Sequence, residues 1–258
     1  MSAVRYEVAS GVATITLASP ETRNVLTAEA LTALVTYLAE AAQDSDVRVV
    51  VLTGEGTTFC AGADLAGVSS DDAASFSGSG PRALVAVLEA MLEHPKPIIA
   101  RVQGHVAGGG NGLVAAADLA VAAESARFAF SEVRVGVAPA VISVVCLARM
   151  SPSHARELLL TGERVSAERV REAGLVTAVA EDDALDSVVQ AYVDRLLLGG
   201  PEALARTKEL LRRVPTMSRA EAFAWTAELS AGLFASDEAR EGMTAFLGRR
   251  RPSWAPPA

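Results

Sequence analysis

The chain has 258 residues, of which 50% are hydrophobic and 21% are charged, and its formal net charge is −8. These values are ordinary for a globular protein, and the acidic balance argues against a nucleic-acid partner. No apolar run reaches the roughly 18 residues of a membrane span, and the first residues lack a signal peptide's apolar segment. Cys60 and Cys146 do not indicate a disulfide framework, so we expect a reducing, cytoplasmic location.

The N-terminal part predicts alternating strands and helices. A β-hairpin is expected over residues 6–17, around a turn at Ser10-Gly11. Short apolar runs that are typical of strands buried on both faces of a sheet lie at 47–53, 97–102 and 119–123. Helices are predicted at 28–43, where Thr27 is the expected N-cap, at 81–94 and at 108–118. This order favours an α/β fold with right-handed crossovers and mainly parallel sheets.

The pattern becomes mostly helical after Ser151. The predicted helices are 153–160, 166–172, 184–198, 201–213, 218–235 and 237–248, and only 176–179 is expected to be extended. We therefore predict an α/β core over residues 1–195 and a helical C-terminal region over 196–258. Two segments are expected to be loose: 69–72 within a Gly/Ser/Asp-rich stretch, and the proline-containing tail at 252–257.

Two loops of small residues follow predicted strands, at 59–65 (FCAGADL) and 104–112 (GHVAGGGNG). Both lie at the carboxyl ends of parallel strands, where open α/β sheets bind ligands. A helix that begins at the triple glycine would present free N–H groups, and two such donors can stabilise a developing oxyanion. The residues alone also fit glycines that merely allow tight turns. The phosphate-binding patterns GxGxxG and GxxxxGKS/T are absent here, so a nucleotide phosphate site is not indicated.

A series of motifs in a fixed order adds to this reading. They are PETRNVL at 20–26, VLTG at 51–54, FCAGADL at 59–65, PIIARVQG at 97–104, AGGGNGLVAAAD at 107–118, FAFSEVRVGVAP at 128–139, LTGE at 160–163, AGLV at 173–176 and DEAREGMTAF at 237–246. This series resembles the crotonase (enoyl-CoA hydratase/isomerase) superfamily over nearly the whole chain. Residues 108–118 and 131–143 are similar to those of bacterial enoyl-CoA and methylglutaconyl-CoA hydratase paralogues.

The resemblance implies a fold of stacked ββα turns with a helical C-terminal trimerisation region. It implies an acyl-CoA substrate, no cofactor beyond the coenzyme A of that substrate, no membrane partner, and a homotrimer or a dimer of trimers. It also implies that the backbone N–H groups of Ala63 and Gly109 form an oxyanion hole and that Glu132 is catalytic. The coenzyme A thioester site that it implies consists of Thr22, Arg23, Asn24, Ala61, Ala63, Asp64, Leu65, Ala66, Gly108 and Gly109.

The resemblance further implies that a basic side chain within 249–251 reaches the coenzyme A phosphates of a neighbouring subunit. Residues 66–82 are expected to shape the acyl end of the pocket, and residues 140–143 depart from the glycine-rich stretch of conventional hydratases. No cluster of His, Cys and carboxylate residues has the spacing of metal ligands. His105 is expected to be a structural imidazole rather than a base.

Family hydratases use two glutamates, and this chain departs from that pattern. The second glutamate corresponds to Glu132, but Gly112 stands in place of the first. Three chemistries remain open: Glu132 alone supports hydration, Glu132 shuttles a proton as in a Δ3,Δ2-enoyl-CoA isomerase, or another polar group assists. A catalytically degenerate acyl-CoA-binding paralogue is a further alternative.

Two environments are possible for Glu132 from the sequence. It could be a surface carboxylate paired with Arg134 or Arg127. A catalytic Glu132 would instead lie among the apolar residues Phe128, Phe130 and Val133, and this burial would raise its pKa.

Overall fold

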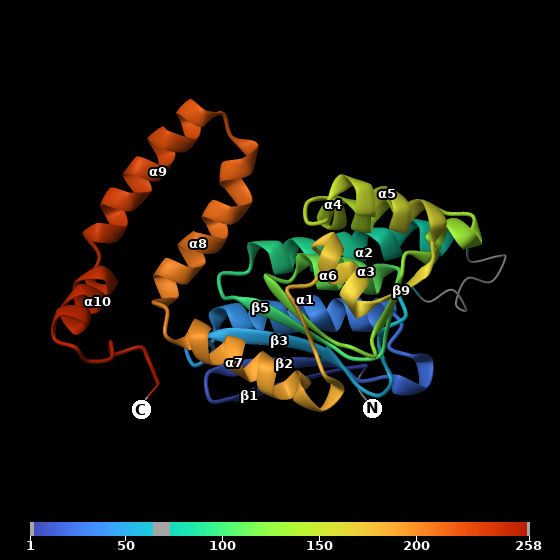
Figure 1. The fold of residues 1–258 in the computed structure, drawn as a ribbon, viewed down its shortest axis with the longest axis horizontal. Helices are drawn as coiled ribbons and strands as arrows, with labels where there is room; N and C mark the ends of the chain where they lie inside the picture. The colour runs from blue at the N-terminus through green and yellow to red at the C-terminus, as the bar shows by residue number, and fades with distance from the viewer. Residues whose placement is uncertain (1–2, 64–72, 257–258) are drawn as a thin grey trace.

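A computed structural model of the chain describes residues 3–63 and 73–256, with the side chains of 73–79 excepted (Figure 1). The segment predicted to be loose at 69–72 lies outside the described residues. The same holds for three of the predicted site residues, Asp64, Leu65 and Ala66.

The larger sheet of the described chain has six strands in the order β1-β2-β3-β5-β7-β10. Their bounds are Val4–Ala9, Val12–Leu17, Val49–Gly54, Ile98–Val102, Leu119–Ala123 and Ala178–Ala180. β1 and β2 form the predicted antiparallel hairpin, and the other neighbouring strands pair in parallel. The predicted α/β class with a mainly parallel sheet is therefore confirmed.

A second, four-stranded sheet in the described residues has the order β4-β6-β8-β9. Its strands are Thr58–Cys60, His105–Ala107, Arg127–Ala129 and Arg164–Ser166. This sheet was not predicted, because three-residue strands are too short to show an alternating pattern. β3, β5 and β7 of the larger sheet are each followed by a strand of the smaller sheet and then by a helix, which is the expected stacked ββα arrangement.

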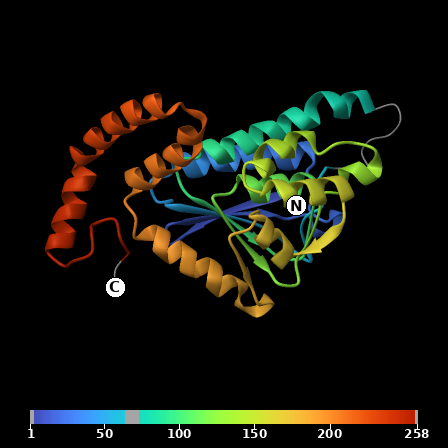
Figure 2. The same cartoon turned by 45° about the horizontal axis from the view of Figure 1, so that its top comes forward.

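Helices cover both faces of the larger sheet (Figures 1 and 2). α1 contacts β1 and β2 and carries α2 on its outer side, while α7 contacts β3, β5 and β7 from the other face. The helices of the core are α1 (Ala28–Gln43), α2 (Ala73–Glu93), α3 (Gly109–Ala116), α4 (Ala140–Leu147), α5 (Pro152–Thr161), α6 (Ala167–Ala173) and α7 (Leu185–Leu197). Short 3₁₀ helices are η1 (Pro20–Thr22), η2 (Ser131–Val135), η3 (Asp182–Ala184) and η4 (Val214–Thr216).

The N-terminus of α1 shows why the predicted helix forms at this place. The Thr27 hydroxyl accepts a hydrogen bond from the Ala30 N–H at 3.1 Å, as an N-cap does. Leu31, Leu34 and Leu38 then repeat at helical spacing and are buried against the sheet.

Two helices differ from the prediction. α2 begins at Ala73 rather than at Pro81, so Pro81 lies inside the helix instead of opening it. Proline lacks the N–H that a helix interior uses, which is why the sequence favoured a helix start there. α4 was not predicted, because its run AVISVVCL is apolar throughout and lacks the polar spacing of a surface helix.

The C-terminal helices α8 (Pro201–Arg213), α9 (Arg219–Phe234) and α10 (Asp237–Leu247) extend away from the sheets in both views (Figures 1 and 2). The tail after them was expected to be loose, but its described part is tied to the core. The Trp254 indole N–H donates to the Leu198 carbonyl at 3.1 Å, and Arg48 donates to the Trp254 carbonyl at 2.9 Å. Across the described ranges, no helix is both long and apolar enough to cross a membrane.

Candidate active site

The two small-residue loops predicted to carry the chemistry lie in direct contact. Gly62 has φ of +88°, and a Cβ atom there would lie 2.9 Å from the Ala107 carbonyl oxygen and 3.2 Å from the Gly109 nitrogen. A Cβ atom on Gly110 would lie 2.8 Å from the Cys60 carbonyl oxygen. Any side chain at either position would push the loops apart, so glycine is required for this close approach.

The close approach brings together two unused backbone donors. Neither the Ala63 N–H nor the Gly109 N–H donates a hydrogen bond within the described residues. Gly109 is the first residue of α3, where helix geometry leaves the N–H without an intrahelical partner. Ala63 and Gly109 line the same pocket, and their joint binding of one ligand oxygen remains a prediction.

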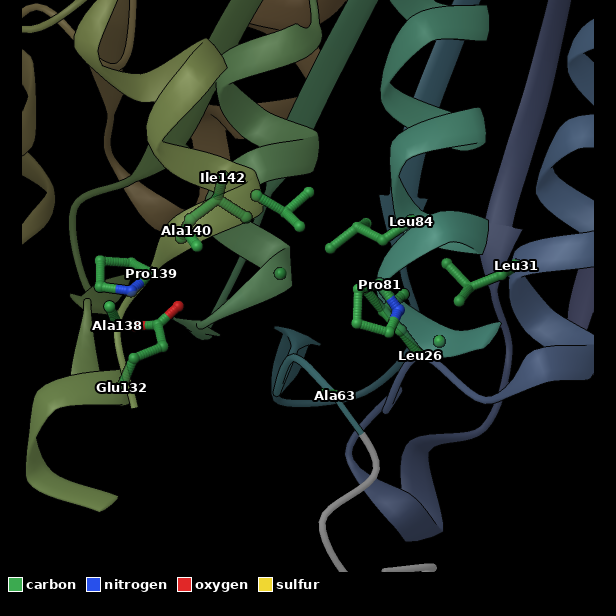
Figure 3. A pocket seen from close by; sticks show the side chains of 13 residues that line it. Leu26, Leu31, Ala63, Pro81, Leu84, Glu132, Ala138, Pro139, Ala140 and Ile142 are labelled. Atoms are coloured by element: carbon green, nitrogen blue, oxygen red, sulfur yellow. The ribbon is translucent and has the colours of Figure 1, made fainter. Parts of the chain in front are cut away.

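The pocket is an apolar cavity of about 260 Å³ between α2 and the start of α4. Figure 3 shows Leu31, Pro81 and Leu84 on one side of it and Pro139, Ala140 and Ile142 on the other. The residues that line it are Leu26, Leu31, Ala63, Gly80, Pro81, Leu84, Gly109, Glu132, Ala138, Pro139, Ala140, Val141 and Ile142.

Glu132 enters this pocket from η2, and its carboxyl group points into the cavity (Figure 3). Its Oε2 atom is buried and has no hydrogen-bond partner within the described residues. Its Oε1 atom lies 3.7 Å from where a Cβ of Gly108 would stand, which places the carboxyl group beside the start of α3. Burial raises the pKa of Glu132 above its ordinary value, because the apolar surroundings disfavour the charged form.

The structure does not show the alternative in which Glu132 is a paired surface carboxylate. Arg134 donates from Nε to the Thr161 carbonyl at 3.1 Å, and Arg127 donates to the Ala126 carbonyl at 2.9 Å. Within the described chain Glu132 forms no salt bridge. Among the described residues, the Oε2 atom of Glu132 therefore has neither an ion-pair nor a hydrogen-bond partner.

Gly112, which stands where family hydratases have their other glutamate, has no room for a side chain. A Cβ atom there would lie 2.7 Å from Cγ2 and 3.3 Å from Cβ of Ile142, and 3.5 Å from Cδ2 of Leu88. Cβ and Cγ2 of Ile142 have little freedom to move, because Ile142 is buried and its side chain is β-branched. The described residues therefore provide one carboxylate at this site, and the wall beside it is apolar.

Five predicted thioester-site residues in the described part of the chain do not line the pocket: Thr22, Arg23, Asn24, Ala61 and Gly108. The Arg23 carbonyl accepts from the Ala61 N–H at 3.1 Å. The buried Asn24 side chain donates from Nδ2 to the Thr58 carbonyl at 2.7 Å and to the Glu55 carbonyl at 2.9 Å. These bonds hold the loop that carries Ala63. Contact of Thr22, Arg23, Asn24, Ala61 and Gly108 with a thioester therefore remains a prediction.

Other reactive side chains lie outside the pocket. His105 is exposed on β6, and both of its ring nitrogens approach the Arg164 guanidinium, at 2.7 and 3.0 Å. Cys60 is buried, and its burial raises the pKa of the thiol to about 12, so it carries no thiolate at neutral pH. In the described part of the chain, no three His, Cys, Asp or Glu residues are grouped as metal ligands would be.

Part of the pocket wall lies in segments that were predicted from the sequence to shape it. Gly80 and Pro81 fall in the predicted segment 66–82, and Ala140, Val141 and Ile142 fall in the predicted segment 140–143. Three leucines were missed because apolar residues at helical spacing also fit ordinary core packing: Leu26, Leu31 and Leu84.

An apolar pocket with one carboxylate and two free N–H donors is typical of sites that bind a carbonyl compound and move protons next to it. Comparison with known proteins identifies the class further. The family model for enoyl-CoA hydratase/isomerase matches residues 7–257. The 2,3-dehydroadipyl-CoA hydratase of Escherichia coli is 34% identical over 242 residues, which cover 93% of each chain.

Two further comparisons agree. The trans-2-decenoyl-acyl-carrier-protein isomerase of Streptococcus mutans is 28% identical over 97% of each chain. The crystal structure of an enoyl-CoA hydratase from Mycobacterium smegmatis superposes with a TM-score of 0.92 at 34% identity, over 98% of each chain. The chain belongs to the enoyl-CoA hydratase/isomerase family, the crotonase superfamily, and is an enzyme of the hydratase or isomerase type.

Proposed function

We propose that this protein is an enoyl-CoA hydratase-type lyase that adds water to a 2-enoyl-CoA thioester with one catalytic glutamate. The observation that supports this most strongly is the position of Glu132, whose Oε2 atom has no hydrogen-bond partner among the described residues, in the pocket that Ala63 and Gly109 also line. In this proposal the Ala63 and Gly109 N–H groups bind the thioester oxygen. Negative charge develops on that oxygen as the enolate forms, so the two donors stabilise the transition state more than the substrate.

Glu132 carries out the proton transfers in this scheme. Its carboxylate takes a proton from a water molecule while the water oxygen bonds to C3 of the enoyl group. The electron pair of the C2–C3 double bond moves to the thioester oxygen as the enolate. Glu132 then returns its proton to C2, the carbonyl re-forms, and one water molecule has supplied both parts. The scheme needs no cofactor beyond the coenzyme A of the substrate.

A Δ3,Δ2-enoyl-CoA isomerase is the alternative that one observation favours. The space beside Gly112 is filled by Ile142, so a second carboxylate to hold the attacking water is absent among the described residues. In an isomerase, Glu132 would remove a proton from C2 of a 3-enoyl-CoA and deliver it to C4. The same oxyanion hole would stabilise the dienolate between the two steps.

Two assays on the same preparation separate these reactions. We expect loss of the enoyl thioester absorbance of crotonyl-CoA, with 3-hydroxybutyryl-CoA as the product. Conversion of a 3-enoyl-CoA to the 2-enoyl-CoA without hydration of either would instead show the isomerase. Coenzyme A ester binding without turnover of any enoyl-CoA would show a degenerate binding paralogue.

The chain also suggests which basic residue would reach a neighbouring subunit's coenzyme A. Arg250 forms a salt bridge with Glu241 at 2.7 Å, and Arg251 donates to the Pro256 carbonyl at 2.8 Å. Arg249 has no side-chain partner within the described residues, and we propose it for this role. The proposal assumes a homotrimer or a dimer of trimers.

A further inference from the structure

The acyl part of the pocket carries no positive charge. Among its described lining residues, Glu132 is the one ionisable side chain, and none is Lys, Arg or His. Leu26, Leu31 and Leu84 form one side, and Pro139, Ala140 and Ile142 form the other. A substrate group that enters between these walls meets hydrocarbon and one acidic side chain (Figure 3).

The segment between the two described ranges, and the helix start that follows it, contribute no basic side chain. The sequence from 64 to 79 contains no Lys, Arg or His, and it contains Asp64, Asp71 and Asp72. This statement holds for any conformation of that segment, because it depends on composition alone. The next basic residue along the chain is Arg82, which is exposed and does not line the pocket.

The lack of a cation has a direct consequence for the acyl group. A carboxylate that leaves water for an apolar cavity loses its hydration, and this loss is large unless a cation or several donors replace the water. Here the nearest charge inside the cavity would be the carboxylate of Glu132, which repels it. A methyl-terminated chain has no such penalty and gains from burial against the leucines and Ile142.

We infer that this enzyme selects 2-enoyl-CoA esters with an uncharged, apolar acyl group and discriminates against those whose acyl chain ends in a carboxylate. The inference rests on the proposed function, since it assigns the substrate class of the same site. The inferred selectivity differs from that of the Escherichia coli relative, which is 34% identical and is named for a substrate with a carboxylate, 2,3-dehydroadipyl-CoA.

Matched ester pairs with acyl chains of equal length test the inference on the full-length protein. The binding pair is hexanoyl-CoA and adipoyl-CoA, measured by calorimetry. The turnover pair is trans-2-hexenoyl-CoA and 2,3-dehydroadipyl-CoA, measured as kcat/KM. We expect adipoyl-CoA to bind at least about tenfold more weakly, and kcat/KM to be at least about 100-fold lower for the dehydroadipyl ester, because a buried carboxylate lacks a partner.

A charge introduced into the pocket should weaken this selectivity. Leu84→Arg adds a cation to the wall, and we expect it to reduce the preference for hexanoyl-CoA over adipoyl-CoA by about tenfold or more, as a buried charge pair allows. Val85→Arg is the matched control, because Val85 is on the same helix but is exposed and outside the pocket. The control should keep the preference of the unmodified protein.

The outcomes separate this inference from the proposed reaction. Equal or tighter binding of adipoyl-CoA, or an equal or higher kcat/KM on the dehydroadipyl ester, would overturn the inferred substrate class even if the enzyme hydrates both. Tighter binding of hexanoyl-CoA with no turnover of any enoyl ester would refute the proposed reaction and support the substrate class. The inferred substrate class would also be overturned if Val85→Arg reduced the preference for hexanoyl-CoA over adipoyl-CoA as much as Leu84→Arg does.

Discussion

Glu132 carries the proposed chemistry, and its environment sets the pH at which it can act. Its carboxyl group is half-buried, and burial raises its pKa above the ordinary 4.5. A general base must be ionised, so activity should rise as pH increases through this raised pKa. We therefore expect the ascending limb of the kcat/KM profile to lie above pH 4.5. A limb at or below that pH would contradict the assignment.

The Glu132→Gln variant tests the raised pKa of Glu132 through the stability of the folded protein, independently of catalysis. Between the unfolded and the raised folded pKa, the folded protein holds more protons on Glu132 than the unfolded chain does. The stability of the unmodified protein should therefore fall as pH rises through this window, and the contribution should level off above the folded pKa. Glutamine does not titrate, so the variant should gain stability relative to the unmodified protein from pH 4 to pH 7 in denaturant titrations.

At the scale of elements, the contact of α3 with α4 depends on the Gly112–Ile142 pair. A methyl group at 112 would overlap Ile142, so Gly112→Ala should destabilise the protein by about 1–3 kcal/mol, as overpacking does. In an Ile142→Ala background the same change should cost less, because the overlapping atoms are gone. Denaturant unfolding of the single and double variants measures this coupling. Additive free energies would show that the two residues do not compete for space.

The sequence predicted the elements whose residues repeat with a clear period. α1 matches its predicted bounds, because Thr27 caps it and apolar residues repeat at helical spacing. β4, β6, β8 and β9 were missed, because each has three residues and forms through contacts with distant segments. Pro81 led to a late predicted start for α2, because proline lacks the N–H that a helix interior uses, whereas the helix begins at Ala73.

The same division holds for the candidate site. Motif order pointed to Ala63, Gly109 and Glu132, and the structure brings them to one pocket. Leu26, Leu31 and Leu84 belong to that pocket, but nothing in their local sequence separates them from core leucines. The close packing of Ile142 against Gly112, which leaves no room for a side chain at 112, could not be predicted from the sequence. The two residues are on different helices, and their contact is seen only in the structure.

At the scale of the whole molecule, α9 and α10 expose an unusual number of large apolar side chains. Phe223 is 70% exposed, Phe234 71% and Phe246 82%, whereas single exposed apolar residues are ordinary. We predict that a homotrimer or a dimer of trimers covers them, so light scattering should give a mass of three or six times 26.7 kDa. Phe246→Asp should lower that mass. A single-chain mass at micromolar concentration would contradict the prediction.

The most direct test of the central claim is the loss of crotonyl-CoA absorbance in the unmodified protein and in Glu132→Gln, with coenzyme A ester binding measured in parallel. We expect the unmodified protein to hydrate crotonyl-CoA and the variant to do so at least about 100-fold more slowly, because general base catalysis contributes that much. Ester binding should be the same in both proteins. A Glu132→Gln variant that hydrates crotonyl-CoA at the unmodified rate would contradict the single-glutamate mechanism.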